Sequence, residues 1–408
     1  MKILMTNNAL TARGGSESYL ETAAAELRKL GHEVVLFSRV SGLTADRLRE
    51  QGFEVLDATD RLPRDIDVIH GQHTNAVALV REQLPTVPLV FATHSWVISI
   101  EDPMAELGAG AYVAFNELTR RRLEAHAATA GSEVVRLTQP VEVSFADGTR
   151  EPVAAPPRRA VAVSRGMTTL PVRLAKACAE LGVDFRRVGG EGEVVPDPRQ
   201  DMLGADIVFA IGRTALEAMA AARAVLVIDE TALGGWVSSA SYTELEADGF
   251  TGLGVGDIGR GVDPAEVDLT ELLSRYEPDL GRQARRLVTR HHAAQHHAAA
   301  LVEVYRSVAD APASEVSGGT IAVLSQDRFR LENRAVHAEW KVARLERELD
   351  AVRSELEGRL REREHLLARV SGLGDRLRRA RTRARRFRRQ RDRAREALAA
   401  TGRRWRRS

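Results

Sequence analysis

The stretch from Asp206 to Asp229 reads "DIVFAIGRTALEAMAAARAVLVID", which is a strand, a helix and a second strand in immediate succession. It belongs to an alternation that begins with "AVAVSR" at Ala160 and includes "LPVRLAKACAELG" and "DFRRVGG". Strands that alternate with helices predict right-handed crossovers and a parallel sheet. This stretch therefore predicts a doubly wound α/β domain.

The first part of the chain repeats the same alternation. "KILMT" at Lys2, a helix "SESYLETAAAELRKLG" and "EVVLFSR" follow one another. The later runs "DVIHGQ" and "PLVFATHS" are short and do not alternate, as expected of strands buried on both faces. The fold class is therefore α/β, with two doubly wound Rossmann-like domains that face a cleft. Such sheets bind ligands beyond the carboxyl ends of their strands.

The predicted domain limits follow from changes in composition. The first domain covers residues 1–140, and the proline-rich segment 141–158 is a hinge. Residues 159–308 form the second domain, and its last helix is expected to run without a break from Gly281 to Ala309. Residues 309–325 contain "DAPASEVSGG" and are expected to be a flexible linker.

Residues 326–400 carry a heptad pattern. Alternating steps of four and three residues from Leu331 to Leu398 meet 20 positions, and all are apolar except Arg359, Arg363 and Arg391. A heptad sustained over this length predicts a coiled coil and, through it, a homodimer. "SGLG" at residues 371–374 is a point where the helix could break or fold back.

The charge of the chain is unevenly distributed. Residues 376–408 hold 16 arginines against two acidic residues, so this tail carries +14 and residues 1–375 carry −12 of the total of +2. Such a tail attracts anionic lipid headgroups or nucleic acid. Alternatively, its arginines only flank the coiled-coil seam and keep it in solution. We rank this interpretation equal to membrane binding, and we rank nucleic-acid binding below both.

Other totals limit the class of protein. No run of about 20 apolar residues is present, and "MKILM" is followed by polar "TNN" rather than by the apolar stretch of a signal peptide. The single cysteine, Cys178, lies on an amphipathic stretch and is expected to be a buried, inert thiol. These features predict a cytoplasmic protein, with contact to the inner face of the plasma membrane through its tail.

Two strand-to-helix junctions carry the candidate site. In "ARGGSE", Gly14 and Gly15 let backbone N–H groups approach an anion at a helix N-terminus, although Ser18 and Glu21 also fit an ordinary capping box. In the second domain, "GRTALEAMA" opens with Gly212 and Thr214 at a comparable turn, and a glutamate follows one helical turn later. N–H groups suit a diphosphate and a carboxylate suits ribose hydroxyls, so the pattern favours a nucleotide sugar.

"GGSE", "THS", "VSR" and "GRTALEAMA", in this order, resemble the motifs of the family 4 nucleotide-sugar-dependent glycosyltransferases. The resemblance covers residues 1 to about 308. It implies a twin-Rossmann B-type fold, retention of anomeric configuration, a nucleoside diphosphate sugar as co-substrate and no tightly bound cofactor. It also implies roles for individual residues. The donor and substrate residues are Gly14, Gly15, Glu17, Arg165, Gly212, Arg213, Thr214 and Glu217, with His94 at the transferred sugar and Glu217 at the ribose.

The chain departs from the family pattern at two positions. Phe209 stands where the family usually has a glutamate that contacts the sugar, and "VSRGMTTLP" lacks the lysine that normally neutralises phosphate. Arg213 could supply part of that charge. Because of these departures, an alternative function remains: a scaffold that binds a nucleotide without catalysing transfer. There are two weaker alternatives: a sugar-nucleotide epimerase with the same fold, and a protein that binds nucleic acid through its basic tail.

No metal site is predicted. The nearest acidic pair, Glu101 and Asp102, is expected in a solvated loop. A metal site is also suggested by four histidines, because His292 and His296 would share a helical face. The four are His291, His292, His296 and His297. Without a neighbouring acid or cysteine, a polar helix surface near the hinge is the better prediction.

Overall fold

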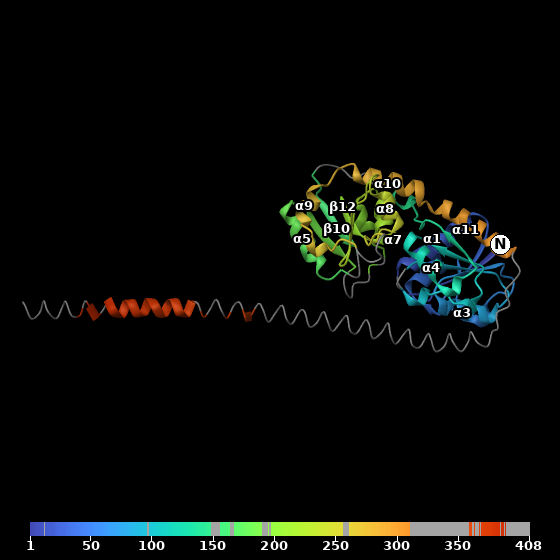
Figure 1. Cartoon of the computed structure of the whole chain (residues 1–408), viewed down its shortest axis with the longest axis horizontal. Helices are drawn as coiled ribbons and strands as arrows, with labels where there is room; N and C mark the ends of the chain where they lie inside the picture. The colour runs from blue at the N-terminus through green and yellow to red at the C-terminus, as the bar shows by residue number, and fades with distance from the viewer. Residues whose placement is uncertain are drawn as a thin grey trace, which may run out of the picture. The chain divides into compact units, whose positions relative to one another are not determined.

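A computed structural model describes residues 1–11, 13–95, 98–147, 156–163, 167–189, 195, 197–255 and 261–310, and in the C-terminal part residues 359–360, 363, 367, 369–383, 385–386 and 388. The chain divides into two units, Met1–Arg330 and Leu331–Ser408. Figure 1 shows the helices and strands of the first unit, which contains two large sheets and a two-stranded pair. We call the part built on each sheet the first lobe and the second lobe.

The first lobe is built on a parallel sheet of seven strands in the order β5-β3-β1-β6-β7-β8-β9. Its strands are β1 (Lys2–Thr6), β3 (Glu33–Phe37), β5 (Glu54–Leu56), β6 (Val68–Gly71), β7 (Leu89–Thr93), β8 (Ala111–Ala114) and β9 (Glu133–Arg136). A separate pair joins β2 (Ala9–Leu10) to β4 (Val40–Ser41). The strand order reverses between β1 and β6, which is where doubly wound sheets bind ligands.

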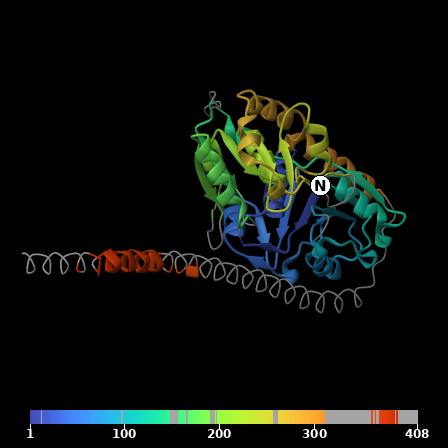
Figure 2. The same cartoon turned by 60° about the vertical axis from the view of Figure 1, so that its left-hand side comes forward.

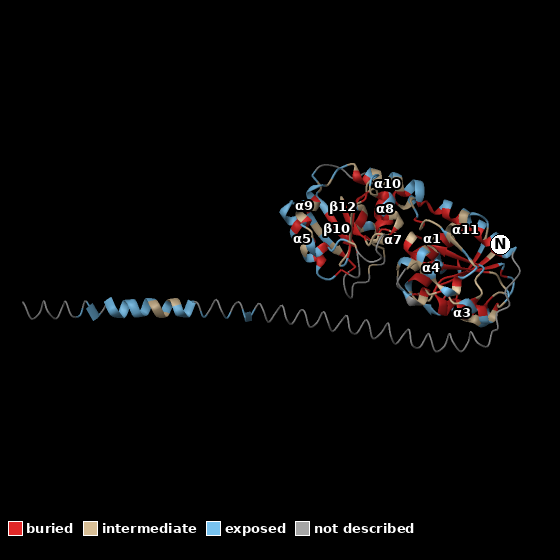
Figure 3. Cartoon of the chain, in the orientation of Figure 1, coloured by how far each residue is buried: buried red, intermediate tan, exposed pale blue. Residues whose placement is uncertain are grey.

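Helices cover both faces of this sheet. They are α1 (Gly15–Lys29), α2 (Leu43–Glu50), α3 (Thr74–Gln83) and α4 (Glu117–Ala125), with short 3-10 helices at Thr59–Arg61, Ser99–Glu101, Ala105–Leu107 and Ala127–Thr129. Neighbouring residues of β1 enter different cores: Ile3 and Met5 pack on one face, and Leu4 packs on the other. Burial on both faces explains the apolar runs without alternation. Figure 3 shows these strands as buried and the outer helix faces as exposed.

The second lobe repeats this construction with five strands in the order β11-β10-β12-β13-β14. The strands are β10 (Arg159–Val163), β11 (Asp184–Val188), β12 (Ile207–Ala210), β13 (Ala224–Ile228) and β14 (Leu233–Trp236), of which only β14 is antiparallel to its neighbour. The order reverses between β10 and β12. The two-sheet α/β class predicted from the sequence is confirmed.

The helices of the second lobe are α5 (Leu170–Glu180), α6 (Arg199–Leu203), α7 (Gly212–Ala220), α8 (Tyr242–Ala247), α9 (Leu269–Ser274) and α10 (Leu280–His291), with 3-10 helices at Ser144–Ala146 and Pro264–Glu266. Cys178 on α5 is fully buried in the core with Phe209, as predicted for an inert thiol. Burial raises the pKa of its thiol to about 11, which keeps it protonated and unreactive.

The helix predicted over Gly281–Ala309 is wrong as a single element. It is divided into α10 and α11 (Ala294–Ala309), and the break lies at His292 and Ala293. There the N–H of Val141 donates to the carbonyl of His292 over 2.8 Å, and Val141 pairs with Ala293 as in a parallel strand. The backbone at the break is therefore bonded to the hinge instead of to the next helical turn.

The break lets the chain return to the first lobe. Helix α10 packs on α7 and β13, whereas α11 packs on α1 and β7. Leu301 and Tyr305 of α11 accordingly belong to the core around β1. Figures 1 and 2 show this orange segment running from the second lobe onto the first.

The predicted linker at 309–325 and most of the coiled coil at 326–400 and of the tail at 376–408 lie outside the described residues. The described part includes one continuous helix over residues 369–383, so "SGLG" at 371–374 does not interrupt it. Its apolar side chains Val370, Leu373 and Leu377 are exposed. Within the described ranges, no helix has both the length and the apolar character needed to cross a membrane.

Candidate functional site

The candidate site lies where the carboxyl ends of both sheets meet. In the first lobe, the chain leaves β1 at Asn7 and reaches the glycine pair at the start of α1. In the second lobe, it leaves β12 at Ala210 and enters α7 at Gly212. Both junctions are at the switch points of their sheets.

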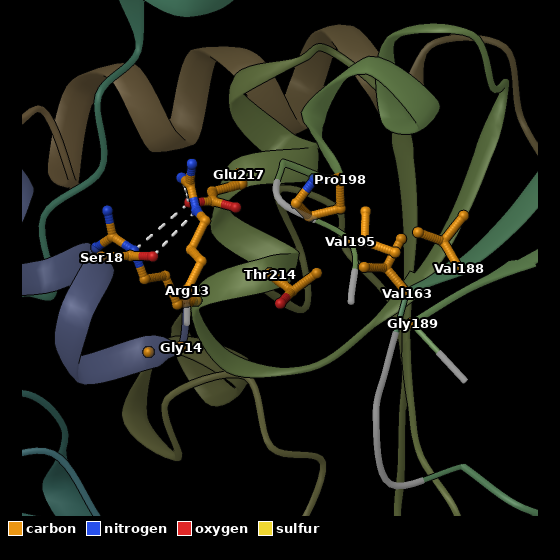
Figure 4. A pocket seen from close by; sticks show the side chains of 12 residues that line it. Arg13, Gly14, Ser18, Val163, Val188, Gly189, Val195, Pro198, Thr214 and Glu217 are labelled. Carbon is orange, nitrogen blue, oxygen red and sulfur yellow. Dashed lines mark hydrogen bonds and ion pairs between the residues drawn. The ribbon is translucent and has the colours of Figure 1, made fainter. Parts of the chain in front are cut away.

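A pocket of about 210 Å³ lies between these junctions. The first lobe and the second lobe both line it, and Figure 4 shows their side chains. The lining residues are Arg13, Gly14, Gly15, Ser18, Val163, Val188, Gly189, Val195, Pro198, Arg213, Thr214 and Glu217.

The glycine pair forms the start of α1. Gly14 is the N-cap and Gly15 the first helical residue, so the capping box predicted from Ser18 and Glu21 is wrong. Ser18 lies inside the helix, where its hydroxyl accepts a hydrogen bond from Arg13 Nε over 3.1 Å. A Cβ at Gly14 would meet the carboxylate of Glu17, whereas one at Gly15 would meet no atom within 4 Å. Gly15 thus leaves space that the protein itself does not use.

We expect Gly15→Ala to separate ligand binding from stability. The change should leave the free energy of unfolding equal or up to about 1 kcal/mol higher, because alanine restricts the unfolded chain more than glycine. It should weaken binding of a ligand in this pocket about tenfold, because the new methyl group takes up space beside the pocket wall. Titration calorimetry and urea unfolding measure the two effects.

Gly31→Ala is the matched control, since Gly31 follows the other end of α1 with φ of +84°. There alanine is strained, so stability should fall by about 1 kcal/mol while binding is unchanged. Equal nucleotide affinity of wild type and Gly15→Ala would contradict the assignment of this wall.

The second lobe provides an apolar wall and a second helix N-terminus. Val163 and Val188 are the last residues of β10 and β11, and Val195 continues this surface. Gly212 opens α7 with φ of +55°, a conformation that glycine adopts without strain, and its N–H donates to the carbonyl of Phe250 over 2.8 Å. Thr214 lies in the first turn of α7 and lines the pocket.

Glu217 lies between two arginines at the interface of the lobes. Its Oε1 accepts a hydrogen bond from Arg13 Nη2 over 2.9 Å and lies 3.5 Å from Arg213 Nε. Arg213 in turn donates from Nη1 to the carbonyl of Pro140 over 2.5 Å and from Nη2 to Thr22 Oγ1 over 2.6 Å. Both Glu217 and Arg213 are buried. Arg213 therefore connects the second lobe to Pro140, directly before the hinge, and to α1.

His94 follows β7 and lies one layer behind the pocket. Its ring stacks on Phe115 at 4.6 Å and meets the edge of Tyr19 at 4.7 Å. Gln72 donates from Nε2 to the carbonyl of Thr6, so its Oε1 accepts from His94 Nε2 over 2.6 Å. The buried Nδ1 of His94 has no hydrogen-bond partner in the structure. Burial first, and the neighbouring His73 second, lower the pKa of His94, so the ring is neutral and Nδ1 is an acceptor.

The prediction of a solvated loop is wrong for Glu101. This residue is only 2% exposed, and its Oε2 accepts hydrogen bonds from the N–H groups of His94 and Ser95, each over 2.6 Å. Its carboxylate therefore fixes the loop that carries His94. Burial raises the pKa of Glu101 to about 7, although the two backbone hydrogen bonds act in the opposite direction. Asp102 forms an ion pair with Arg122.

Glu101→Gln should change how stability depends on pH. In the wild type, the folded pKa of Glu101 lies above its unfolded value, so ionisation costs stability as the pH rises through about 7. Glutamine accepts the same two hydrogen bonds without a charge. Relative to wild type, the variant should thus gain about 2 kcal/mol in unfolding free energy between pH 5 and pH 8. Urea unfolding at both pH values measures this difference. If the stability of wild type and of Glu101→Gln changed equally with pH, the raised pKa of the buried Glu101 would be refuted.

The four histidines near the hinge do not share one helical face. Helix α10 ends at His291 and α11 begins at Ala294, so His292 and His296 are not one turn apart on one helix. His292 and His297 are buried, so the predicted polar helix surface is wrong for these two histidines. His292 bonds to the carbonyl of Gln139 and to Tyr242, while His297 bonds to the carbonyl of Thr138 and to Tyr19. Within the described ranges, no cluster of three or more His, Cys, Asp or Glu residues is arranged to hold a metal ion.

The structure thus brings most of the predicted residues to one pocket. Gly14, Gly15, Arg213, Thr214 and Glu217 line it, whereas Glu17, His94 and Gly212 lie beside it. Arg165 lies outside the described residues.

Arg13 is the charged lining residue that the sequence motifs did not identify. The available signal was its place directly before the glycine pair, but an arginine-rich composition weakened that signal. A second cavity of about 270 Å³ lies behind Arg13, Arg213 and Glu217 and includes Arg199 in its lining.

Comparisons with known proteins bear on the fold. No protein-family model and no curated protein sequence matches the chain. Among solved structures, the pneumococcal O-GlcNAc transferase GtfA, in complex with UDP and GlcNAc, has a TM-score of 0.51 at 9% identity, over 76% of this chain and 99% of that chain.

Two further structures are similar over the same part of the chain. A mutant of S. aureus TarM in complex with UDP has a TM-score of 0.48 at 9% identity, over 76% of this chain and 100% of that chain. Anabaena HepE in complex with UDP and glucose has a TM-score of 0.47 at 13% identity, over 75% of this chain and 100% of that chain. The similarity to GtfA and the two parallel sheets of the lobes indicate the twin-Rossmann fold of B-type glycosyltransferases, and the likeness concerns the fold alone.

Proposed function

We propose that the chain transfers a sugar from a nucleoside diphosphate sugar to an acceptor hydroxyl with retention of anomeric configuration. The observation that carries this proposal is the convergence of two helix N-termini on one pocket: Gly15 opens α1, and Thr214 lies in the first turn of α7. Two such termini favour an anion between them. The buried Glu217 and the apolar wall then suit the ribose and the base of a nucleotide.

The parts of a donor are assigned as follows. The base lies against Val163 and Val188, and Glu217 accepts hydrogen bonds from the ribose hydroxyls. Gly14 and Gly15 lie against the diphosphate or the acceptor, and the start of α7 from Gly212 to Thr214 receives the distal phosphate. Arg165 is assigned to the phosphates from the family resemblance.

His94 is assigned to the transferred sugar. Its neutral ring has a buried Nδ1 without a hydrogen-bond partner, and a sugar hydroxyl that reached this atom would donate to it. Glu101 holds the loop that carries His94 and so acts as a positioning residue.

The reaction exchanges two bonds at the anomeric carbon. The bond to the diphosphate oxygen breaks, and a bond to the acceptor oxygen forms on the same face of the sugar. The acceptor proton passes to the departing diphosphate, and a nucleoside diphosphate leaves. The protein contributes orientation and electrostatic stabilisation, for which the helix N-termini and arginine side chains are suited.

A second function is favoured by one specific position. Phe209, where the family usually has a sugar-contacting glutamate, is fully buried in the core next to Phe185. No polar group from this position reaches the pocket. The alternative is therefore a protein that binds a nucleotide without turnover and acts as a scaffold.

The C-terminal unit is proposed to connect this enzyme to partners. The heptads of residues 326–400 pair two chains, and the basic tail at 376–408 meets an anionic membrane surface at the inner face of the plasma membrane, where glycolipid or surface polysaccharide is made. Deletion of residues 326–408 should reduce the mass in solution from that of two full chains to that of one shortened chain, as measured by light scattering. Liposome sedimentation with and without 376–408 tests the membrane contact, and equal binding would refute it.

The donor site is tested by thermal unfolding with a panel of UDP-, GDP- and ADP-sugars. At 100 times the Kd, a ligand that binds only the folded state raises the unfolding free energy by about 2.7 kcal/mol. UDP-N-acetylglucosamine is the first member to test, because a protein of similar fold was solved with UDP and GlcNAc. An unchanged unfolding temperature with every member would overturn the donor site.

A further inference from the structure

Arg13 connects the two lobes at the wall of the pocket. Its Nη2 donates to Glu217 Oε1 over 2.9 Å, and its Nη1 lies 3.5 Å from Asp197 Oδ1. Its Nε donates to Ser18 Oγ over 3.1 Å. The side chain is 10% exposed and lines both the pocket and the second cavity behind it. Figure 4 shows it reaching from the start of α1 toward Glu217.

Each carboxylate that Arg13 contacts also has another arginine. Asp197 accepts hydrogen bonds from Arg199, with distances of 2.6 to 2.9 Å. Burial alone would raise the pKa of Asp197, but the hydrogen bonds from Arg199 outweigh it and keep that pKa below its usual value. Glu217 similarly has Arg213 at 3.5 Å. If Arg13 turned away, neither the buried Glu217 nor the partly exposed Asp197 would be left without a cation.

The two other arginines are less able to turn toward a ligand. Arg213 uses both terminal nitrogens for Pro140 and Thr22, and Arg199 is engaged with Asp197. Arg199 also pairs with Glu142 over 3.3 Å, so two carboxylates hold it in place. Arg13 is therefore the cation of this cluster that can exchange partners at the smallest electrostatic cost.

We propose that Arg13 binds the diphosphate of the donor, and that it leaves Glu217 when the nucleotide enters. This inference rests on the proposed function. The guanidinium can form two parallel hydrogen bonds with phosphate oxygens, which suits a diphosphate better than a point charge does. The exchange also frees Glu217 Oε1 for the ribose. The side chain of Arg13 thus supplies positive charge in place of the lysine that is missing from "VSRGMTTLP".

The exchange makes binding selective for phosphate. A nucleoside must compete with Arg13 for Glu217 and offers no anion in return, whereas a nucleoside diphosphate does. Arg13→Met should consequently weaken binding of UDP at least tenfold and leave binding of uridine unchanged or tighter. Arg13→Lys should restore part of the affinity for UDP, because the charge remains while the two-pronged geometry is lost.

The experiment is titration calorimetry of the full chain with uridine, UMP and UDP, or with the series of whichever base the panel selects. Arg199→Met is the matched control: it removes an arginine from the same carboxylate, Asp197, but does not line the first pocket. Its ratio of UDP to uridine affinity should equal that of wild type. Circular dichroism and thermal unfolding establish that each variant is folded.

The outcomes separate the two proposals. A loss confined to UDP and UMP in Arg13→Met supports the role of Arg13. Equal losses for uridine and UDP, or an unchanged affinity for UDP, overturn that role and leave the donor site in place. A wild type that binds no nucleotide overturns both.

Discussion

At pH 5, the first unit should be less stable than at pH 7.5 by several kcal/mol, because its folded state buries neutral histidines. His70, His73, His292 and His297 are each at most 5% exposed. Burial lowers the pKa of His70 and His297 to about 3 and that of His73 and His292 to about 4. The unfolded chain binds protons near pH 6.5, so stability is lost as the pH falls below that value.

The size of this effect follows from the same pKa values. Each of these histidines contributes about 2 kcal/mol of destabilisation at pH 5, so the four together give about 8 kcal/mol. His94, whose pKa is also lowered by burial, adds to this loss. Glu101 acts in the opposite direction by about 2 kcal/mol, since its raised pKa favours the folded state at low pH. A typical domain has an unfolding free energy of about 5–15 kcal/mol, so the net loss at pH 5 is a large fraction of its stability.

Two neighbouring histidines provide the control. His297→Gln should reduce the number of protons taken up on unfolding between pH 7.5 and pH 5 by about one. His296→Gln changes an exposed residue next to it and should leave the pH profile unchanged. Urea unfolding followed by circular dichroism at several pH values gives these numbers, and a stability that is constant from pH 7.5 to pH 5 would contradict the buried histidines.

Glu217→Ala should have the largest effect of any single change in the pocket. It removes the carboxylate shared by Arg13 and Arg213 and leaves two cations close together in a buried site. Breaking a buried ion pair in this way costs about 3–5 kcal/mol of stability. Loss of the proposed hydrogen bonds to ribose should also weaken nucleotide binding at least 100-fold.

Glu217→Gln distinguishes the two consequences. Glutamine keeps the shape and one acceptor oxygen, so part of the lost stability should return, while binding stays impaired because one side-chain oxygen is replaced by a donor. Glu246→Ala, which breaks another ion pair between the lobes with Arg136, is the matched control and should leave nucleotide binding unchanged. A Glu217→Ala variant that binds nucleotides as wild type does would refute the ribose assignment.

The sequence predicts the fold well because its strands are buried on both faces. Runs such as "DVIHGQ" and "PLVFATHS" correspond to β6 and β7, and "DIVFAIGRTALEAMAAARAVLVID" corresponds to β12, α7 and β13. The break between α10 and α11 could not be predicted locally. It depends on a hydrogen bond from Val141 to His292, which are remote in sequence.

The site could be predicted only where a local motif carries it. Glycines before a helix and "GRTALEAMA" identify both helix N-termini that line the pocket. Glu101 was missed, because the polar segment around it resembles a solvated loop and its burial depends on the loop that carries His94. The pairing of Arg13 with Glu217 joins residues from different lobes, so no local pattern records it.

The central claim is that this pocket transfers a sugar, and the most direct measurement is proton NMR of a donor incubated with the full chain. With the UDP-, GDP- or ADP-sugar that stabilises the wild type, we expect release of the nucleoside diphosphate and a first-formed sugar product with the anomeric configuration of the donor. Glu217→Ala should be inactive under the same conditions. Tight binding of the nucleotide sugar without any release of nucleoside diphosphate, with acceptor sugars and alcohols present, would contradict transfer and identify a nucleotide-binding scaffold instead.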